Sequence, residues 1–180
     1  MIHGYNGIPK IYEWLKEKLE KEGYSVVLPK FPTQQNVIYE KWRMILDDYK
    51  DDINCETVLI AHSIGNEFII KYLGEYNLKI KKYISLAGFA EKFENEGKED
   101  LNRAIKEFLV TKEEIEVFKK LVDKKYSIYS DNDHIVPFKV LEKYSKIIDS
   151  EPILIKNIGH MGKKSGLETI PEVLELVDNN

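Results

Sequence analysis

The sequence predicts an α/β domain in three layers, with a mostly parallel central sheet of about six strands covered by helices on both faces. Two observations support this prediction. Short runs rich in β-branched and aromatic residues alternate with stretches in which apolar residues recur every three or four positions. No internal repeat or linker-like segment interrupts this alternation, so we expect a single domain over residues 1–180.

The expected elements follow one another in chain order. The expected strands are Tyr24–Leu28, Thr57–Ala61, Tyr83–Ala87, Tyr126–Ser130 and Ile153–Lys156. Apolar stripes that predict helices begin at Ile8, Ile38, Phe68, Leu101, Ile115, Val140 and Val173. Gly23 is placed to end the first helix, and Thr111 with Glu114 forms a capping box that opens the fifth. The segment 89–123 is long for a simple crossover and has room for a small two-helix lid.

Composition excludes several classes of function. The 27 basic residues against 31 acidic ones give a net charge of −4 with no basic face, which argues against a nucleic-acid partner. No apolar run approaches the ~20 residues of a membrane span, and the N-terminal residues do not resemble a signal peptide, so we expect a cytoplasmic protein without a membrane partner. Phosphate-loop, dinucleotide and metal-ligand motifs are absent from the sequence, and we expect neither a cofactor nor a metal.

The first chemical signal is a serine placed between a strand and a helix. The expected strand Thr57–Ala61 runs directly into His62, Ser63, Ile64 and Gly65, where a helix begins. A small residue two positions before the serine and another two positions after it are typical of a nucleophile elbow, in which strand and helix pass closely. The start of the helix also directs free backbone N–H groups at an oxyanion formed beside the serine.

An acid and a histidine follow later strands. Asp131 and Asp133 come after the strand that ends at Ser130, and His160 follows the last strand. Because parallel strands end at the same edge of a sheet, these side chains and Ser63 are expected to meet there. The order serine, acid, histidine along the chain is that of α/β-hydrolases. We interpret Ser63 as a nucleophile and His160 as its base.

On these residues the chain resembles the small α/β-hydrolases of the family that includes YdeN and the retinoblastoma-binding serine hydrolase. Further segments that carry the resemblance are His3-Gly4-Tyr5-Asn6-Gly7, Trp14-Leu15-Lys16, Gly23-Tyr24-Ser25-Val26, Pro29-Lys30-Phe31-Pro32 and Trp42. The resemblance implies a compact sheet with a minimal cap and a triad of Ser63, Asp133 and His160. It favours Asp133 over Asp131 as the acid, through the spacing to Pro137 and to His160. It also implies an oxyanion hole formed by the backbone N–H groups of Tyr5 and Ile64.

Other residues near these motifs are candidates for contacts with substrate. They are His3, Gly4, His62 and Phe89. For His3 and His62 a structural role is the alternative, and His134 is expected on a surface loop. The family has a full strand before the His-Gly turn, whereas here only Met1 and Ile2 precede it. We expect either that a preceding stretch is missing or that another segment fills this slot, and we favour the former.

Two functions are consistent with the sequence. The first is a serine hydrolase of the carboxylesterase type that cleaves a small soluble carboxylic ester, thioester or amide through an acyl-enzyme. The second, which the resemblance also allows, is a binding or regulatory protein that keeps the hydrolase fold and acts through a protein partner with little or no catalysis.

Overall fold

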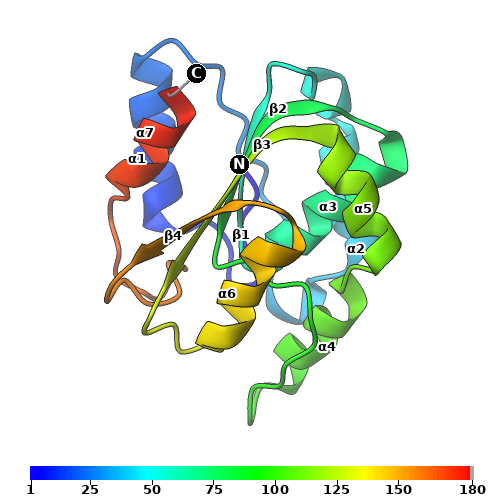
Figure 1. The fold of residues 1–180 in the computed structure, drawn as a ribbon, viewed down its shortest axis with the longest axis vertical. Helices are drawn as coiled ribbons and strands as arrows, with labels where there is room; N and C mark the ends of the chain where they lie inside the picture. The colour runs from blue at the N-terminus through cyan, green and yellow to red at the C-terminus, as the bar shows by residue number, and fades with distance from the viewer. Residues whose placement is uncertain (179–180) are drawn as a thin grey trace.

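The central sheet of the computed structural model, which describes residues 1–178, has four parallel strands (Figure 1). They are β1 (Val58–His62), β2 (Ile80–Leu86), β3 (Val122–Ser130) and β4 (Glu151–Ile155), hydrogen-bonded in the order β1-β2-β3-β4. β1 and β2 are almost wholly buried, as expected in a sheet covered on both faces, and β1 is apolar from Val58 to Ala61. The predicted parallel α/β architecture is confirmed.

The prediction of about six strands is wrong in number, because two expected strands form no ladder. Ile2 makes a single parallel bridge to Ala61, with its N–H donating to Ile60 O at 2.8 Å. The expected strand Tyr24–Leu28 is not a strand; its contact with this edge is one hydrogen bond, from the Met1 amine to Val27 O at 2.7 Å. With only two residues beside β1, Tyr24–Leu28 lacks a strand long enough to pair with.

Seven helices connect and flank the strands within residues 1–178. They are α1 (Lys10–Lys21), α2 (Tyr39–Asp47), α3 (Ile64–Tyr76), α4 (Glu99–Phe108), α5 (Lys112–Leu121), α6 (Phe138–Ile147) and α7 (Pro171–Asp178), with short 3₁₀ turns at Gln34–Asn36 and Lys50–Asp52. Each expected apolar stripe falls mainly in one of the seven, although Ile8 and Ile38 lie just before the first residues of α1 and α2. The capping box of Thr111 and Glu114 is confirmed, and Gly23 has the positive φ of +92° that suits a glycine just after a helix. None of these helices is long and apolar enough to cross a membrane.

The helices form two layers around the sheet. In Figure 1, α1 and α7 lie together on one side of the strands, and α3 and α5 lie on the other. The buried Lys82 of β2 attaches α7 to the sheet, because its amine donates to the carbonyl oxygens of Leu176 and Val177. This hydrogen bonding satisfies a lysine that would otherwise be costly inside the fold.

The segment 89–123 contributes only its first half to the surroundings of the serine. It contains the two expected helices, but α5 packs against α3, and Phe118 of α5 contacts Tyr83 of β2 edge-to-face at 5.0 Å between ring centroids. The first turn of α4 and the loop before it border the cavity at Ser63. We therefore describe α5 as part of the helical layer and only the start of α4 as a rim of the cavity.

Candidate active site

Ser63 stands at a sharp turn between β1 and α3. β1 ends at His62 and α3 begins at Ile64, so the chain changes from strand to helix at the single residue between them. Ser63 has φ 53° and ψ −131°, backbone angles that residues other than glycine rarely adopt. Its N–H donates to Leu86 O of β2 at 2.9 Å, and its own carbonyl accepts from Asn66 N at 2.9 Å. These bonds hold the strained serine at the carboxyl edge of the sheet.

A glycine in the first turn of α3 allows this turn to pack closely against the N-terminal segment. A Cβ placed on Gly65 would lie 2.7 Å from His3 O and 3.1 Å from Ile2 O, both backbone atoms. Ala61, on the other side of the serine, is fully buried. The requirement for a small residue at position 65 therefore comes from close packing against the backbone of Ile2 and His3.

We expect Gly65→Ala to destabilise the protein by about 1–3 kcal/mol, because the backbone at His3 must move to admit the methyl group. Urea unfolding measures the change. Gly74→Ala in the same helix is the matched control, since its Cβ would lie 3.6 Å from Val117 Cγ1, an ordinary contact. That substitution should stabilise by roughly 0.5–1 kcal/mol, as in other helix interiors. Equal effects at the two positions would contradict the packing argument.

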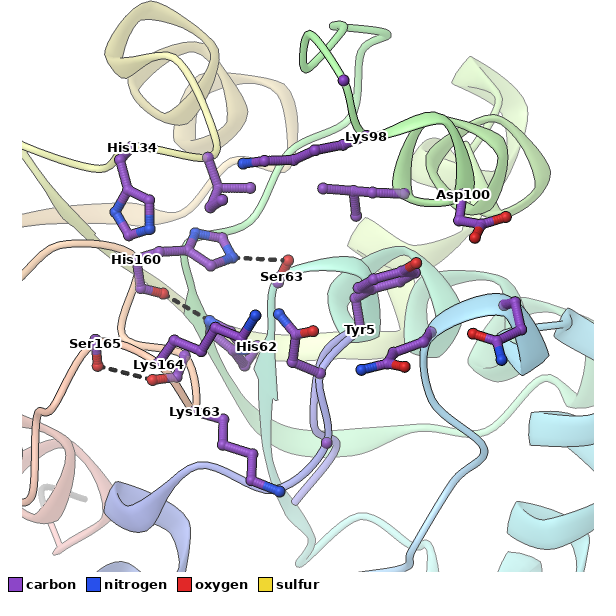
Figure 2. A pocket seen from close by; sticks show the side chains of 18 of the residues that line it. Tyr5, His62, Ser63, Lys98, Asp100, His134, His160, Lys163, Lys164 and Ser165 are labelled. Atoms are coloured by element: carbon purple, nitrogen blue, oxygen red, sulfur yellow. Dashed lines mark hydrogen bonds between the residues drawn. The ribbon is translucent and has the colours of Figure 1, made fainter.

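His160 joins Ser63 to Asp133 through hydrogen bonds on both ring nitrogens. Its Nε2 lies 3.1 Å from Ser63 Oγ, and its Nδ1 lies 2.8 Å from Asp133 Oδ2. Figure 2 shows the imidazole of His160 directed at the Ser63 hydroxyl. The serine and histidine are 4% and 8% exposed, so the pair is held in a largely dry environment next to the cavity. Residues from three strand ends thus meet as the chain order predicts.

The surroundings of Asp133 favour its ionised carboxylate. Burial opposes its charge, but hydrogen bonds from His160 and from the N–H groups of Val136 and Ile135 outweigh this and keep its pKa below the usual value. Both backbone groups donate to Oδ1, Ile135 N at 2.8 Å and Val136 N at 3.0 Å, which leaves Oδ2 for the imidazole. Asp131 lies elsewhere: it is exposed and accepts from Asn157 N at 2.9 Å. Of the two candidate acids, Asp133 is the one beside His160.

The structure gives His62 a position against His160. His62 is 3% exposed, and its Nε2 lies 2.7 Å from the backbone O of His160. A carbonyl oxygen only accepts, so Nε2 carries the proton and donates. Burial, followed by the neighbouring His160, lowers the pKa of His62 to about 3. His62 is therefore neutral at ordinary pH, and its donated hydrogen bond holds the loop that carries His160.

Protonating His62 should cost stability in acid. The unfolded chain binds a proton on this side chain below pH 6.5, whereas the folded chain resists it down to about pH 3. The stabilisation is therefore full above pH 6.5 and is lost as pH falls. Between about pH 7 and pH 5 we expect the free energy of unfolding of the wild type to fall by roughly 2 kcal/mol more than that of His62→Gln, in which the other groups titrate alike. Urea unfolding at both pH values measures this difference, and parallel losses in the two proteins would contradict it.

Two backbone N–H groups near Ser63 are unused by the protein. Tyr5 lies in the loop after Ile2 and lines the cavity, and Ile64 is the first residue of α3. Neither N–H donates a hydrogen bond within the described part of the chain. Unpaired donors at the start of a helix and in an adjacent loop can receive a developing negative charge.

Three residues expected near substrate lie behind the cavity wall. His3 is 1% exposed and uses both ring nitrogens, which contact Gly4 O at 2.8 Å and Phe31 N at 3.0 Å. Gly4 packs against the elbow, because a Cβ there would lie 3.0 Å from Ser63 Cβ. Phe89 is 1% exposed and stacks edge-to-face on Phe93. The structure places all three outside the lining of the cavity, and of the expected contacts only His62 lines it.

The cavity above Ser63 has a volume of about 470 Å³ and includes several polar residues that sequence reasoning did not identify. These are Asn6, Gln34, Gln35, Lys98, Glu99, Asp100, His134, Lys163, Lys164 and Ser165. His134, expected on a surface loop, is exposed but also lines the cavity, with its ring centroid 6.5 Å from that of His160. Lys163 and Lys164 lie three and four residues after His160, in the same loop.

No group of three or more histidine, cysteine or carboxylate side chains within residues 1–178 is arranged to hold a metal ion. The side chains that meet at Ser63 are a hydroxyl, an imidazole and a carboxylate.

The family model described as serine hydrolase matches residues 1–179. The chain belongs to the serine hydrolase family. It is 24% identical to the Bacillus subtilis protein YdeN over 98% of this chain and 92% of that one. The crystal structure of the B. subtilis ydeN gene product superimposes with a TM-score of 0.81, covering 98% of this chain and 94% of that one.

More distant solved structures share the fold of this serine hydrolase. A meta-cleavage product hydrolase from Pseudomonas fluorescens IP01 is 14% identical with a TM-score of 0.70, and the match covers 98% of this chain and 86% of that one. An extracellular α/β-hydrolase from a Paenibacillus species is 19% identical with a TM-score of 0.67, covering 98% and 95%. The α/β-hydrolase fold predicted from the sequence is thereby confirmed.

Proposed function

We propose that this serine hydrolase cleaves small acyl substrates, a carboxylic ester, thioester or amide, through an acyl-enzyme on Ser63. One observation carries the proposal: the unbroken chain of hydrogen bonds from Asp133 through His160 to the hydroxyl of a strained, buried serine. A serine that only capped a helix would need neither the histidine nor the ionised acid behind it. The combination is that of an activated nucleophile.

The acylation step follows from the contacts of His160. As the Ser63 oxygen attacks the acyl carbonyl, Nε2 of His160 takes the hydroxyl proton across the 3.1 Å contact. Asp133 holds Nδ1 protonated, so that Nε2 is free to accept, and stabilises the imidazolium that forms. His160 then gives its proton to the departing alcohol, thiol or amine as the tetrahedral intermediate collapses.

The oxyanion of that intermediate would be received by the N–H groups of Ile64 and Tyr5, each worth about 2.7–4 kcal/mol of barrier. Water then enters, loses a proton to His160 and releases the acid from Ser63 by the same steps in reverse order. The cavity of about 470 Å³ suits a small acyl group. Its rim is formed by the first turn of α4 and polar loops, rather than by the broad apolar surface that a lipid interface would require.

A fluorophosphonate probe tests the proposal, because it reacts covalently with activated serines. We expect the wild type to be labelled and Ser63→Ala to remain unlabelled. Ser25→Ala, which removes an exposed serine outside this cavity, is the matched control and should label like the wild type. Absence of labelling on folded wild-type protein would contradict the proposal and favour the alternative function, a hydrolase-fold protein that binds a partner.

A further inference from the structure

The cavity at Ser63 carries positive charge, although the whole chain has a net charge of −4. Three lysines line it: Lys98 in the loop before α4, and Lys163 and Lys164 in the loop after His160. Lysines gathered from two separate loops around one reactive serine need an explanation that neither the fold nor the triad supplies.

These three amines are not used by the protein itself. Within residues 1–178, the side chains of Lys98, Lys163 and Lys164 form no ion pair with a carboxylate. By contrast, Lys143 of α6, outside this cavity, pairs with Glu91. All three cavity lysines are exposed, so their charge costs little to maintain. They are available to a ligand.

Figure 2 shows how the three lysines are directed within the cavity that Ser63 and His160 also line. In Figure 2, Lys98 extends across the cavity so that its amine lies above His160, and Lys164 extends from the opposite side toward the space below Ser63. Lys163 points away from the serine in the same view. Lys98 and Lys164 therefore extend from opposite sides of the cavity whose lining includes Ser63.

The acidic residues of the cavity cancel only part of this charge, because Glu99, which forms no ion pair within residues 1–178, stands against three lysines. Glu99 and Asp100 lie in the first turn of α4, and Figure 2 shows Asp100 on the Tyr5 side, away from His160. Asp100 is also paired with Arg103 at 3.2 Å, which neutralises it locally. The net charge of the side chains that line the cavity is therefore positive.

We propose that the natural substrate carries an anionic group, a carboxylate or a phosphate, on the part that enters between Lys98 and Lys164. This inference rests on the proposed acyl hydrolysis at Ser63 and names the class of acyl compound that the site selects. Exposed lysines act on such a group through water-screened attraction. The expected preference over a neutral isostere is therefore on the order of tenfold to a hundredfold in kcat/KM, and it should shrink as salt is added.

The test uses two aryl esters of the same length and shape. One is the 4-nitrophenyl half-ester of adipic acid, with a terminal carboxylate, and the other is the 4-nitrophenyl ester of adipamic acid, with a neutral amide in its place. The measured quantity is the ratio of kcat/KM for the adipate to that for the adipamate, at low and at high salt. We expect the ratio to be at least about ten at low salt and to fall about fivefold or more in Lys98→Gln/Lys164→Gln. A matching half-ester with a terminal phosphate shows whether phosphate is preferred to carboxylate.

Lys41→Gln is the control for net charge, because Lys41 is exposed on α2, outside the cavity, and belongs to no ion pair of the described chain. It should keep the wild-type ratio. A ratio near one in an enzyme that is labelled by fluorophosphonate at Ser63 would overturn the inference and leave the proposed function intact. The inference would also be overturned if labelled enzyme hydrolysed neither ester. It would equally be overturned if Lys41→Gln lowered the ratio of kcat/KM values as far as Lys98→Gln/Lys164→Gln does. Protein that is neither labelled nor active overturns both proposals.

Discussion

His160→Ala should lower kcat by about a million-fold, as much as Ser63→Ala, and the double variant should be no worse than either. The reason lies in the geometry of the site. In the proposed mechanism Nε2 of His160, which lies 3.1 Å from the Ser63 hydroxyl, is the base, so nucleophile and base act in one step. Removing either side chain would leave only the rate acceleration that comes from substrate binding and from the backbone N–H groups of Tyr5 and Ile64.

The measurement is single-turnover hydrolysis of an aryl ester by wild type, the two single variants and the double variant. His134→Ala is the matched control, because this histidine also lines the cavity but its ring lies 6.5 Å from that of His160. We expect it to change kcat by less than about tenfold. If the double variant were slower than each single variant by a further factor of a thousand, the two residues would be acting independently, and the relay from Ser63 to His160 would be wrong.

Most of the fold could be predicted because its signals are local. A parallel strand buried on both faces must be apolar along its length, and a helix on its surface must be apolar on one side. These demands make the runs at β1 and β2 and the stripes of α1 and α3 visible in the sequence. The elbow is visible for the same reason, since Gly65 is small where backbones approach closely and Ala61 is fully buried.

The extent of the sheet could not be predicted in this way. The sequence of Tyr24–Leu28 suits a strand, but a strand needs a partner, and its neighbour here consists of Met1 and Ile2. Pairing is a property of two segments, and the composition of one of them does not reveal it. The choice between Asp131 and Asp133 is similar, because the two carboxylates are two residues apart and only the turn after β3 decides which one faces His160.

The polar lining of the cavity was missed for a different reason. Lys98 and Lys164 are exposed residues in loops, and in a chain with 32% charged residues nothing local distinguishes them from other surface lysines. They become notable only when the fold brings two loops to the same serine and leaves both amines unpaired. His62 was likewise ambiguous, because its hydrogen bond reaches a carbonyl 98 positions away in the chain.

Asp133→Asn should lower kcat by about ten-thousandfold while leaving the fold intact. The expected mechanism is a change of tautomer on His160. Oδ1 of residue 133 is held by the N–H groups of Ile135 and Val136, so an asparagine would keep its oxygen there and turn its NH₂ toward Nδ1 of the imidazole. Nδ1 would then have to accept, the proton would move to Nε2, and the nitrogen that faces Ser63 could no longer act as a base.

Asp131→Asn is the matched control, because it makes the same chemical change two residues away at an exposed carboxyl that contacts Asn157 N rather than His160. We expect it to change kcat by less than about threefold. Both variants should unfold in urea near the wild-type midpoint, which separates loss of catalysis from loss of structure. If Asp131→Asn abolished activity and Asp133→Asn did not, the acid would have been assigned wrongly. If neither did, the orientation of His160 would have to come from the hydrogen bond that His62 donates to its backbone.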